Sequence, residues 1–517
     1  MRTTYLLSIC LVLSSFVNTN VNAEDYTRWG ERWTRNLAIP GLKNLPETFK
    51  PVKRNYQTGK TTLPENSGVK WTATLGNVTC TSPIVCNGKI FIGTNNGNPY
   101  DERIRVDYGI LLCFDEKTGE FLWQLAVPKL IEIRWSDWYH MGICSTPTAE
   151  DDRVYLVTNR CEVVCLDANG MANGNDGPYK EEGKHCVPAG DEPLTPGDKD
   201  ADIIWIYDLH KELKVEPHNA TSSSVIIDGD LLYVATSNGV EHTHNFVKHP
   251  EAPSMIVLNK KTGKLIARDD FKIDGTVTHG QWSSPAMATV DGKKRVFYGA
   301  GNGCVYATDA LPVSAAERKE KKPQLLPAVW KVHGHPLAQE MDEPPVDHQH
   351  DSTSYQITAN PVYNDGSLYV IFTQEPFHGM RKGYLACLDP TGTGNKTKSA
   401  FKWRCDIGSS VSTPAVTKDG LLFVTNFWGV LYCIDAKTGK IHWQQQLNGR
   451  KIWGSPLVAD GKVYIGTDRN FFYVIEAKKE FKMISEIRMG TDVHTTPSVA
   501  NGVLYVPTGG VLYAVEK

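Results

Sequence analysis

The sequence predicts an all-β fold, an eight-bladed β-propeller built of four-stranded antiparallel blades. The first observation is a repeat of about 40 residues, the length of one propeller blade. Pro414, Pro456 and Pro497 open successive repeats at intervals of 42 and 41 residues. The second observation is a Ser/Thr-Pro corner or a variant of it, and the third is an acidic or amide residue before the last turn of the repeat. Both markers occur eight times.

The two sets of markers can be followed along the whole chain. The corner lies at Pro83, Pro147, Ser224, Pro285, Pro361, Pro414, Pro456 and Pro497. The acidic or amide marker lies at Asp115, Asp167, Asn259, Asp309, Asp389, Asp435, Glu476 and Glu516. Because two independent markers give the same count, the sequence favours eight blades.

A tryptophan in the last strand of the repeat is less regular. It occurs at Trp123, Trp205, Trp330, Trp403 and Trp443, with Ala267 and Ser485 in its place in two repeats. The eighth repeat ends at Lys517, before any such strand, but GVKWTATL near the start of the chain supplies one around Trp71. We expect residues 69–75 to complete the blade begun by 497–517, because closure pairs two otherwise open strand edges.

The chain is expected to divide into a signal peptide at 1–23, an N-terminal arm at 24–67 and a propeller at 68–517. In the arm, Trp29, Trp33 and Leu37 are separated by polar residues, which indicates an extended segment packed on the ring. Blade one covers about 76–125. Blade two carries an insertion at 168–200 rich in Gly, Asn, Asp and Pro, which is typical of a loop. SAAERKEKK predicts a short helix before Trp330. Blades six and seven are minimal.

Composition and the first residues indicate an exported protein. Arg2, the apolar run YLLSICLVLSSFV and Val21-Asn22-Ala23 form a signal-peptide pattern, too short for a stable membrane span. The formal net charge of −3 gives no bias toward nucleic acid or anionic lipid. We therefore expect a soluble periplasmic or extracellular monomer with no nucleic-acid partner and no membrane span.

Cysteines leave two alternatives open. The chain has 12, and cleavage would remove Cys10, so the remaining set is odd and cannot be fully paired. One repeat position, two before the acidic marker, is occupied by Cys113, Cys165, Cys387 and Cys433, which we interpret as buried fillers. Cys80 and Cys144 share another position in neighbouring blades. They form either a pair on the inner ring or two separate thiols.

The axial mouth is the expected ligand site, because propeller ligands bind near the axis and the corner residue lies in the innermost strand. Eight residues precede the corner by three positions: Cys80, Cys144, Thr221, Trp282, Thr358, Val411, Trp453 and His494. His140, His218 and His279 lie slightly further out. These side chains suit a flat or polar ligand, and the alternative is that they only fill the ring.

Two further clusters suggest metal ions. Histidines gather with Glu241 at His242, His244 and His249, and again at His333, His335, His348 and His350. His-x-His pairs suit a metal when they share one face of a strand, whereas in loops such residues are often only solvated. Asp198, Asp200 and Asp202 offer oxygen ligands for calcium, although the EF-hand pattern is absent.

The segments DEKTGEFLW, NKKTGKLIA and DAKTGKIHW, together with GKVYIGT, resemble the tryptophan-docking repeats of the pyrroloquinoline quinone (PQQ) family over residues 68–517. SNGVEHTHNF and HGQWSSP are similar to segments of exported PQQ-repeat proteins of planctomycete-type bacteria. The resemblance implies either a quinoprotein alcohol dehydrogenase with PQQ and calcium at the axis, or a non-catalytic propeller such as the outer-membrane assembly lipoprotein.

The dehydrogenase pattern is incomplete in this chain. Those enzymes carry two adjacent cysteines, and none are adjacent here. Thr236-Ser237-Asn238 resembles their T-G-N segment, whose Asn helps to hold calcium. His279-Gly280-Gln281-Trp282-Ser283 keeps His and Trp but has Gly280 and Ser283 at the acidic positions, so the base is lost.

We therefore expect a ligand- or protein-binding or assembly module. Its partner, an unknown protein or a small polar ligand, would meet the axial mouth at His140, His279, Trp282, Trp453, His494 and Asn238. The alternative is a divergent PQQ- and calcium-dependent alcohol or sugar dehydrogenase. In it, Asn238 would be a calcium ligand and Trp282 or Trp453 would stack on the quinone.

Overall fold

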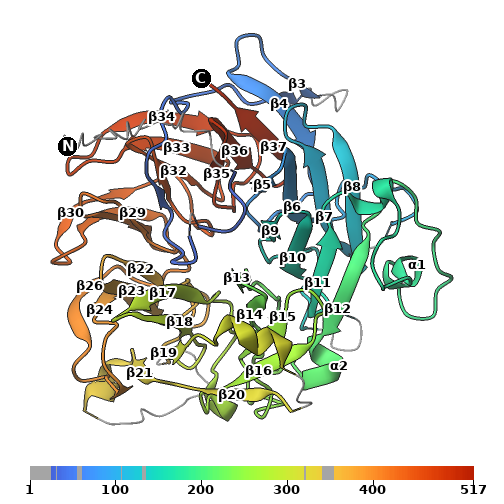
Figure 1. The fold of residues 1–517 in the computed structure, drawn as a ribbon. Helices are drawn as coiled ribbons and strands as arrows, with labels where there is room; N and C mark the ends of the chain where they lie inside the picture. Colours follow the sequence, from blue (N-terminus) through green and yellow to red (C-terminus); the bar gives the residue numbers. More distant parts are fainter. Residues whose placement is uncertain are drawn as a thin grey trace, which may run out of the picture.

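A computed structural model describes residues 25–30, 32–54, 61–105, 107–130, 135–318, 322–340 and 354–517. The expected signal peptide at 1–23, and His348 and His350, lie outside these residues. The fold is the predicted ring of eight antiparallel blades around one axis (Figure 1). No helix in the described part of the chain is long and apolar enough to cross a membrane.

Each blade is a meander whose first strand lies at the axis. The innermost strands are β5 (Ile84–Cys86), β9 (Thr148–Glu150), β13 (Ile226–Asp228), β17 (Ala286–Val290), β22 (Val362–Asn364), β27 (Ala415–Val416), β31 (Leu457–Ala459) and β35 (Ser498–Ala500). The second strands are β6 (Lys89–Asn95), β10 (Arg153–Val157), β14 (Leu231–Ala235), β18 (Lys293–Gly299), β23 (Ser367–Thr373), β28 (Leu421–Thr425), β32 (Lys462–Gly466) and β36 (Val503–Pro507).

The outer half of each blade is formed in the same order. The third strands are β7 (Tyr108–Asp115), β11 (Glu162–Asp167), β15 (Met255–Asn259), β19 (Cys304–Asp309), β24 (Gly383–Leu388), β29 (Val430–Asp435), β33 (Phe471–Glu476) and β37 (Val511–Val515). The outermost strands are β8 (Phe121–Pro128), β12 (Ile203–Asp208), β16 (Leu265–Asp270), β21 (Trp330–His333), β26 (Phe401–Asp406), β30 (Ile441–Gln446), β34 (Met483–Arg488) and β4 (Val69–Thr74).

The predicted circular closure is confirmed. β4, the six-residue strand that contains Trp71, pairs antiparallel with β37. Trp71 lies opposite Ala514, and Thr74 lies opposite Val511. In Figure 1 the blue β4 lies beside the dark red β37, although the two strands come from opposite ends of the chain. The pairing gives β37 a partner on its outer side and makes β4 the outermost strand of the eighth blade.

Neighbouring blades are joined by the tryptophans of the outermost strands. Each indole Nε1 donates to a backbone carbonyl in the last turn of the next blade. For Trp71 this carbonyl is Glu116 O at 3.0 Å, and for Trp403 it is Ala436 O at 3.1 Å. The Trp403 ring lies against Gly439, where a Cβ would come within 2.6 Å of it. The tryptophan of one blade and the glycine turn of the next therefore form one joint.

The glycine is not part of every joint. The turn after Asp309, which follows the blade with Ala267, reads ALPV and has no glycine. The turn after Glu476 reads AKKE and also has none, yet Trp443 Nε1 donates there to Lys478 O at 2.9 Å. A missing glycine therefore does not by itself account for a missing tryptophan.

The arm before β4 crosses the end of the axis that carries the turns between first and second strands. Backbone carbonyls of Tyr26, Thr27, Trp33, Thr34 and Leu37 accept from amides of the innermost strands of blades one, two, four, five and seven. β1 (Ala38–Ile39) adds in parallel to β31. The arm also contributes β2 (Lys53–Arg54) and β3 (Thr61–Thr62), which pair with each other. The predicted extended arm is thus integrated into the ring.

The remaining elements are short and peripheral. The insertion of blade two contains η1 (Gly170–Asn173) and α1 (Glu182–His185), and α2 (Leu209–Leu213) follows β12. The others are η2 (Asp274–Thr276), η3 (Val313–Glu317) and η4 (Pro336–Gln339). η3 is shorter than the helix predicted before Trp330. β20 (Gln324–Pro327) and β25 (Gly394–Asn395) extend blades three and four in parallel, by backbone pairing that no repeat marker indicates.

Candidate functional site

A cavity of about 130 Å³ lies on the axis. Seven of the eight residues three positions before the corners line it: Cys80, Cys144, Trp282, Thr358, Val411, Trp453 and His494. The eighth, Thr221, instead donates its hydroxyl to Thr158 O at 2.6 Å. Corner hydroxyls such as Ser284 and Thr413 complete the wall, and Trp29 of the arm also lines the cavity. The repeat therefore concentrates polar groups at one place, beside the arm.

Cys80 and Cys144 interact inside this cavity. The hydrogen bond with Cys144 lowers the pKa of the Cys80 thiol, and the same bond together with burial raises the pKa of Cys144. Of the two alternatives for these residues, the structure has two separate thiols.

Large apolar side chains are exposed on the loops around the mouth. They are Trp138, Tyr139, Phe246, Phe377, Met380 and Trp453, each between 41% and 60% exposed. These loops either join one blade to the next or connect the second and third strands of a blade, so they share one face of the ring. Phe377 and Trp453 lie 6.0 Å apart between ring centroids, and Lys451 lies over Phe377. Exposed apolar groups on one face are a feature found at many interaction surfaces.

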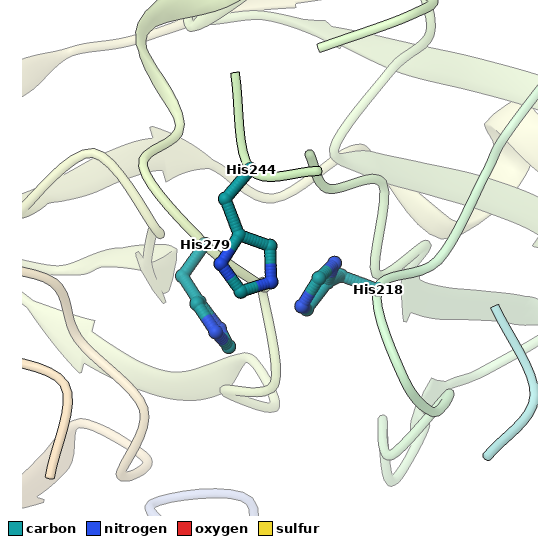
Figure 2. A group of neighbouring side chains, drawn as sticks. All are labelled: His218, His244 and His279. Atoms are coloured by element: carbon teal, nitrogen blue, oxygen red, sulfur yellow. The ribbon is translucent and has the colours of Figure 1, made fainter. Parts of the chain in front are cut away.

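Three histidines meet beside this mouth. His218 lies between β12 and β13, His244 between β14 and β15, and His279 between β16 and β17. Their ring centroids are 4.3 to 4.8 Å apart. Figure 2 shows the three rings turned toward one another from separate loops. One nitrogen of each ring lies within 4.8 Å of one nitrogen of the other two.

A loop of blade five extends this group. His378, between β23 and β24, lies 5.4 Å from His244 and 5.7 Å from His279 between ring centroids. Glu375 accepts from the backbone amides of Phe377 and His378, both at 2.6 Å, and its carboxylate lies 3.2 Å from His378 Nδ1. His279, Glu375 and His378 also offer atoms within 4.8 Å of one another. We call His218, His244, His279, His378 and Glu375 the histidine cluster.

Burial lowers the pKa of His218, His244 and His279, which favours the neutral form of these three rings. Burial and the neighbouring imidazole of His244 lower the pKa of His218 to about 4. Burial and the other three imidazoles lower the pKa of His279 well below its usual value. Burial raises the pKa of Glu375. Neutral imidazoles with free lone pairs are the form in which histidine binds metal ions.

Other predicted site residues lie outside the cluster. The exposed His140 is near Asp107, with 3.9 Å between Nδ1 and the carboxylate. His242 is exposed and pairs with Glu241. The Asn238 amide is hydrogen-bonded to the backbone at both ends, because its Oδ1 accepts from Glu216 N and its Nδ2 donates to His249 O. His494, as predicted from its position before the corner, lies at the cavity.

The first predicted histidine group is divided, because His244 joins the cluster whereas His249 lies 3.7 Å from the carboxylate of Glu216. In the second predicted group, His333 and His335 lie near each other, with ring centroids 6.4 Å apart.

The three aspartates of the D-x-D-x-D segment have different partners. Asp200 accepts from Gly197 N and contacts Arg103. The buried Asp202 accepts from Asp176 N and, with Asp176 and Asp167, forms a group of carboxylates within 4.8 Å of one another. Asp198 is exposed. A calcium site at these residues stays a prediction, and the neighbours of Asp202 would be Asp167 and Asp176.

Sequence reasoning missed Glu375 and His378. No repeated motif marks EPFHGM, and no other histidine lies close to it in sequence. Its one signal is that it occupies the loop between the second and third strands of blade five, on the same face as His244 in blade three.

Comparison with known proteins agrees with this architecture. A family model described as the outer membrane protein assembly factor BamB matches residues 68–334 and 381–516. The 1-butanol dehydrogenase (cytochrome c) of Thauera butanivorans is 34% identical over 122 residues, which are 22% of this chain and 17% of that enzyme. The chain thus spans about a sixth of the length of this curated relative.

BamB from Moraxella catarrhalis, a solved structure, has a TM-score of 0.52 at 13% identity, covering 87% of this chain and 97% of its own. At this identity the likeness is one of fold alone. The quinohemoprotein alcohol dehydrogenase from Comamonas testosteroni has a TM-score of 0.49 at 12% identity, covering 95% of this chain and 80% of its own.

Proposed function

We propose that this chain is an exported binding module. The premise is that it belongs to the PQQ-repeat family described as the outer membrane protein assembly factor BamB. Its partner is a protein segment that presents apolar side chains to the axial mouth. The observation that carries this proposal is the set of six exposed apolar side chains on the mouth loops, at the end of the axis opposite the N-terminal arm.

The quinone and calcium of the dehydrogenases do not fit the residues present. Both polar atoms of the Asn238 amide already bond to backbone groups, which leaves its oxygen one lone pair for an ion. Gly280 stands at one of the acidic positions, and a Cβ there would come within 2.5 Å of the Trp282 ring. The axial cavity of about 130 Å³ is also well below the roughly 300 Å³ at which ligand pockets begin. The site therefore lacks both the ligand set and the space.

A quinone titration tests this exclusion. The purified protein is mixed with PQQ and calcium, and binding is followed by absorbance while a dye-linked assay follows oxidation of alcohols and sugars. We expect neither binding nor oxidation. Oxidation that is lost in Asn238→Ala would instead establish the dehydrogenase.

Site-specific cross-linking tests the binding face. A photo-reactive amino acid is placed at Phe377, which is 50% exposed at the mouth, or at Val313, which is 46% exposed on η3. In cells of the natural host, we expect one reproducible protein adduct from position 377 and none from 313. Equal labelling at both positions, or no adduct at 377, would contradict the proposal.

A further inference from the structure

We propose that the histidine cluster is a binding site for a divalent transition-metal ion of the Zn²⁺ or Cu²⁺ class. His218, His244 and His279 form its core, and His378 with Glu375 closes the side toward blade five. The site does not depend on the identity of the protein partner, so it can hold even if the proposed function fails.

The first argument is convergence from separate parts of the chain. Four loops of blades two to five bring four imidazoles together, although none of the residues His218, His244, His279 and His378 is adjacent to another in sequence. Ligands at about 2.0–2.1 Å from a tetrahedral Zn²⁺ lie roughly 3.3 Å apart. The candidate nitrogens of His218, His244 and His279 lie within 4.8 Å of one another, so binding would draw them closer by up to about 1.5 Å.

The second argument is that buried ring nitrogens of the cluster lack hydrogen-bond partners among the described residues. His279 is 3% exposed, and neither of its nitrogens has a hydrogen-bond partner among the described residues. The Nε2 of His218, also 3% exposed, is likewise unpartnered there. Leaving buried polar atoms without a partner is unfavourable. A metal ion between the rings would satisfy these nitrogens together.

The third argument is orientation by neighbouring groups. His218 Nδ1 lies 3.0 Å from Val240 O, a carbonyl that can only accept a hydrogen bond. That contact places the proton on Nδ1 and leaves the Nε2 lone pair for the cluster, which is how metal-binding histidines are commonly held. On the other side, the backbone amides of Phe377 and His378 hold the Glu375 carboxylate in place.

The donor atoms select the class of metal. Imidazole nitrogens suit Zn²⁺, Cu²⁺ and related ions, whereas Ca²⁺ takes oxygen ligands. A group of four imidazoles and one carboxylate is therefore a poor calcium site. His244 and His378 are partly exposed, so the ion would face the mouth, where a partner or water could supply a further ligand.

Metal titration of the tag-free full-length protein tests the site. The protein is first treated with a chelator, and Zn²⁺, Cu²⁺ or Ca²⁺ is then titrated by calorimetry in competition with a chromophoric chelator. We expect one equivalent of Zn²⁺ or Cu²⁺ to bind, no Ca²⁺ to bind at this site, and the melting temperature to rise with the bound ion.

Matched variants locate the ion. His279→Ala should lower the affinity at least about 100-fold, because losing only an outer-shell partner already costs 10–100-fold. His244→Asn should act similarly, and Asn tolerates the left-handed φ of 63° at this position, so the loop fold is preserved. His242→Ala, two residues away and exposed, is the control and should bind as the wild type does. Unchanged affinity in His244→Asn, or a wild type that binds neither Zn²⁺ nor Cu²⁺, would overturn the proposal.

Discussion

Glu162 shows how a single charge is held inside the ring. It is 3% exposed in β11, where its carboxylate contacts His185 at 3.0 Å and Arg160 at 2.7 Å. Burial alone would raise its pKa, but the charges and hydrogen bonds of His185 and Arg160 outweigh burial and lower it to about 2. Since His185 belongs to α1, this carboxylate also anchors the insertion of blade two.

We predict that Glu162→Gln destabilises the protein at neutral pH. A folded-state pKa of about 2, below an ordinary value near 4.5, gives stabilisation that is complete above about pH 4.5 and is lost as the pH falls through 2. The shift corresponds to a contribution of the Glu162 charge to the free energy of unfolding on the order of 3 kcal/mol. Urea unfolding midpoints of the two proteins at pH 7, 5, 4 and 3 measure the difference.

The control for this titration is Glu181→Gln, which alters an exposed ion pair with Lys184. It should change the midpoint little at any pH, because exposed pairs contribute about 0–1 kcal/mol. A difference between wild type and Glu162→Gln that stays constant from pH 7 to pH 3 would show that the carboxylate charge is not what stabilises the site.

At the scale of residues, the sequence predicts part of the candidate site. His218 and His279 were expected near the mouth because each precedes a corner, and the repeat places every corner on the innermost strand. His378 and Glu375 could not be predicted, since the loop between second and third strands varies freely from blade to blade. Asn238 matched a family motif, but its amide is occupied by backbone groups that no motif describes.

At the scale of elements, the joint between blades links residues that belong to different repeats. Where the turn of the next blade places a glycine against the tryptophan ring, as Gly119 does for Trp71 and Gly439 does for Trp403, a Cβ on that glycine would come within 2.6 Å of the ring. The glycine is not required in every blade, because Trp443 donates to Lys478 O at 2.9 Å in a turn that reads AKKE. By contrast, β1, β20 and β25 add to strand edges through backbone groups alone, so the side-chain pattern gives no sign of them.

We predict that Gly439→Ala destabilises the protein more than Gly461→Ala does. Both glycines have positive φ, 75° and 69°, so both substitutions carry the same backbone strain of roughly 1–2 kcal/mol. At 439 the new Cβ would also come within 2.6 Å of the Trp403 ring, whereas at 461 it would meet no described atom within 4 Å. Melting temperatures compare the two variants. Equal decreases in melting temperature would mean that the joint between blades five and six accommodates the extra Cβ without loss of stability.

At the scale of the whole molecule, the two ends of the chain close the ring in different ways. β4 completes the eighth blade. The arm bonds to several innermost strands at the end of the axis opposite the mouth. Arg35 is fully buried in the arm and donates to carbonyls of Pro285, Ser224, Val225 and Trp29 at 2.6 to 3.2 Å. The arm was expected to pack on the ring, but its contacts around the axis were not predictable, because irregular segments lack periodicity.

We predict that deleting residues 24–75 destabilises the ring far more than deleting 24–60. Both truncations remove the arm with Arg35, so both should melt below the full-length protein. Only the longer deletion also removes β4, which leaves β37 with an unpaired edge and the glycine turn at Gly119 without the Trp71 ring. Melting temperatures and amide hydrogen exchange measure the effect, with protection expected to be lost first in β37. Equal melting temperatures, with β37 equally protected in both truncations, would show that pairing between the two ends of the propeller does not hold the ring closed.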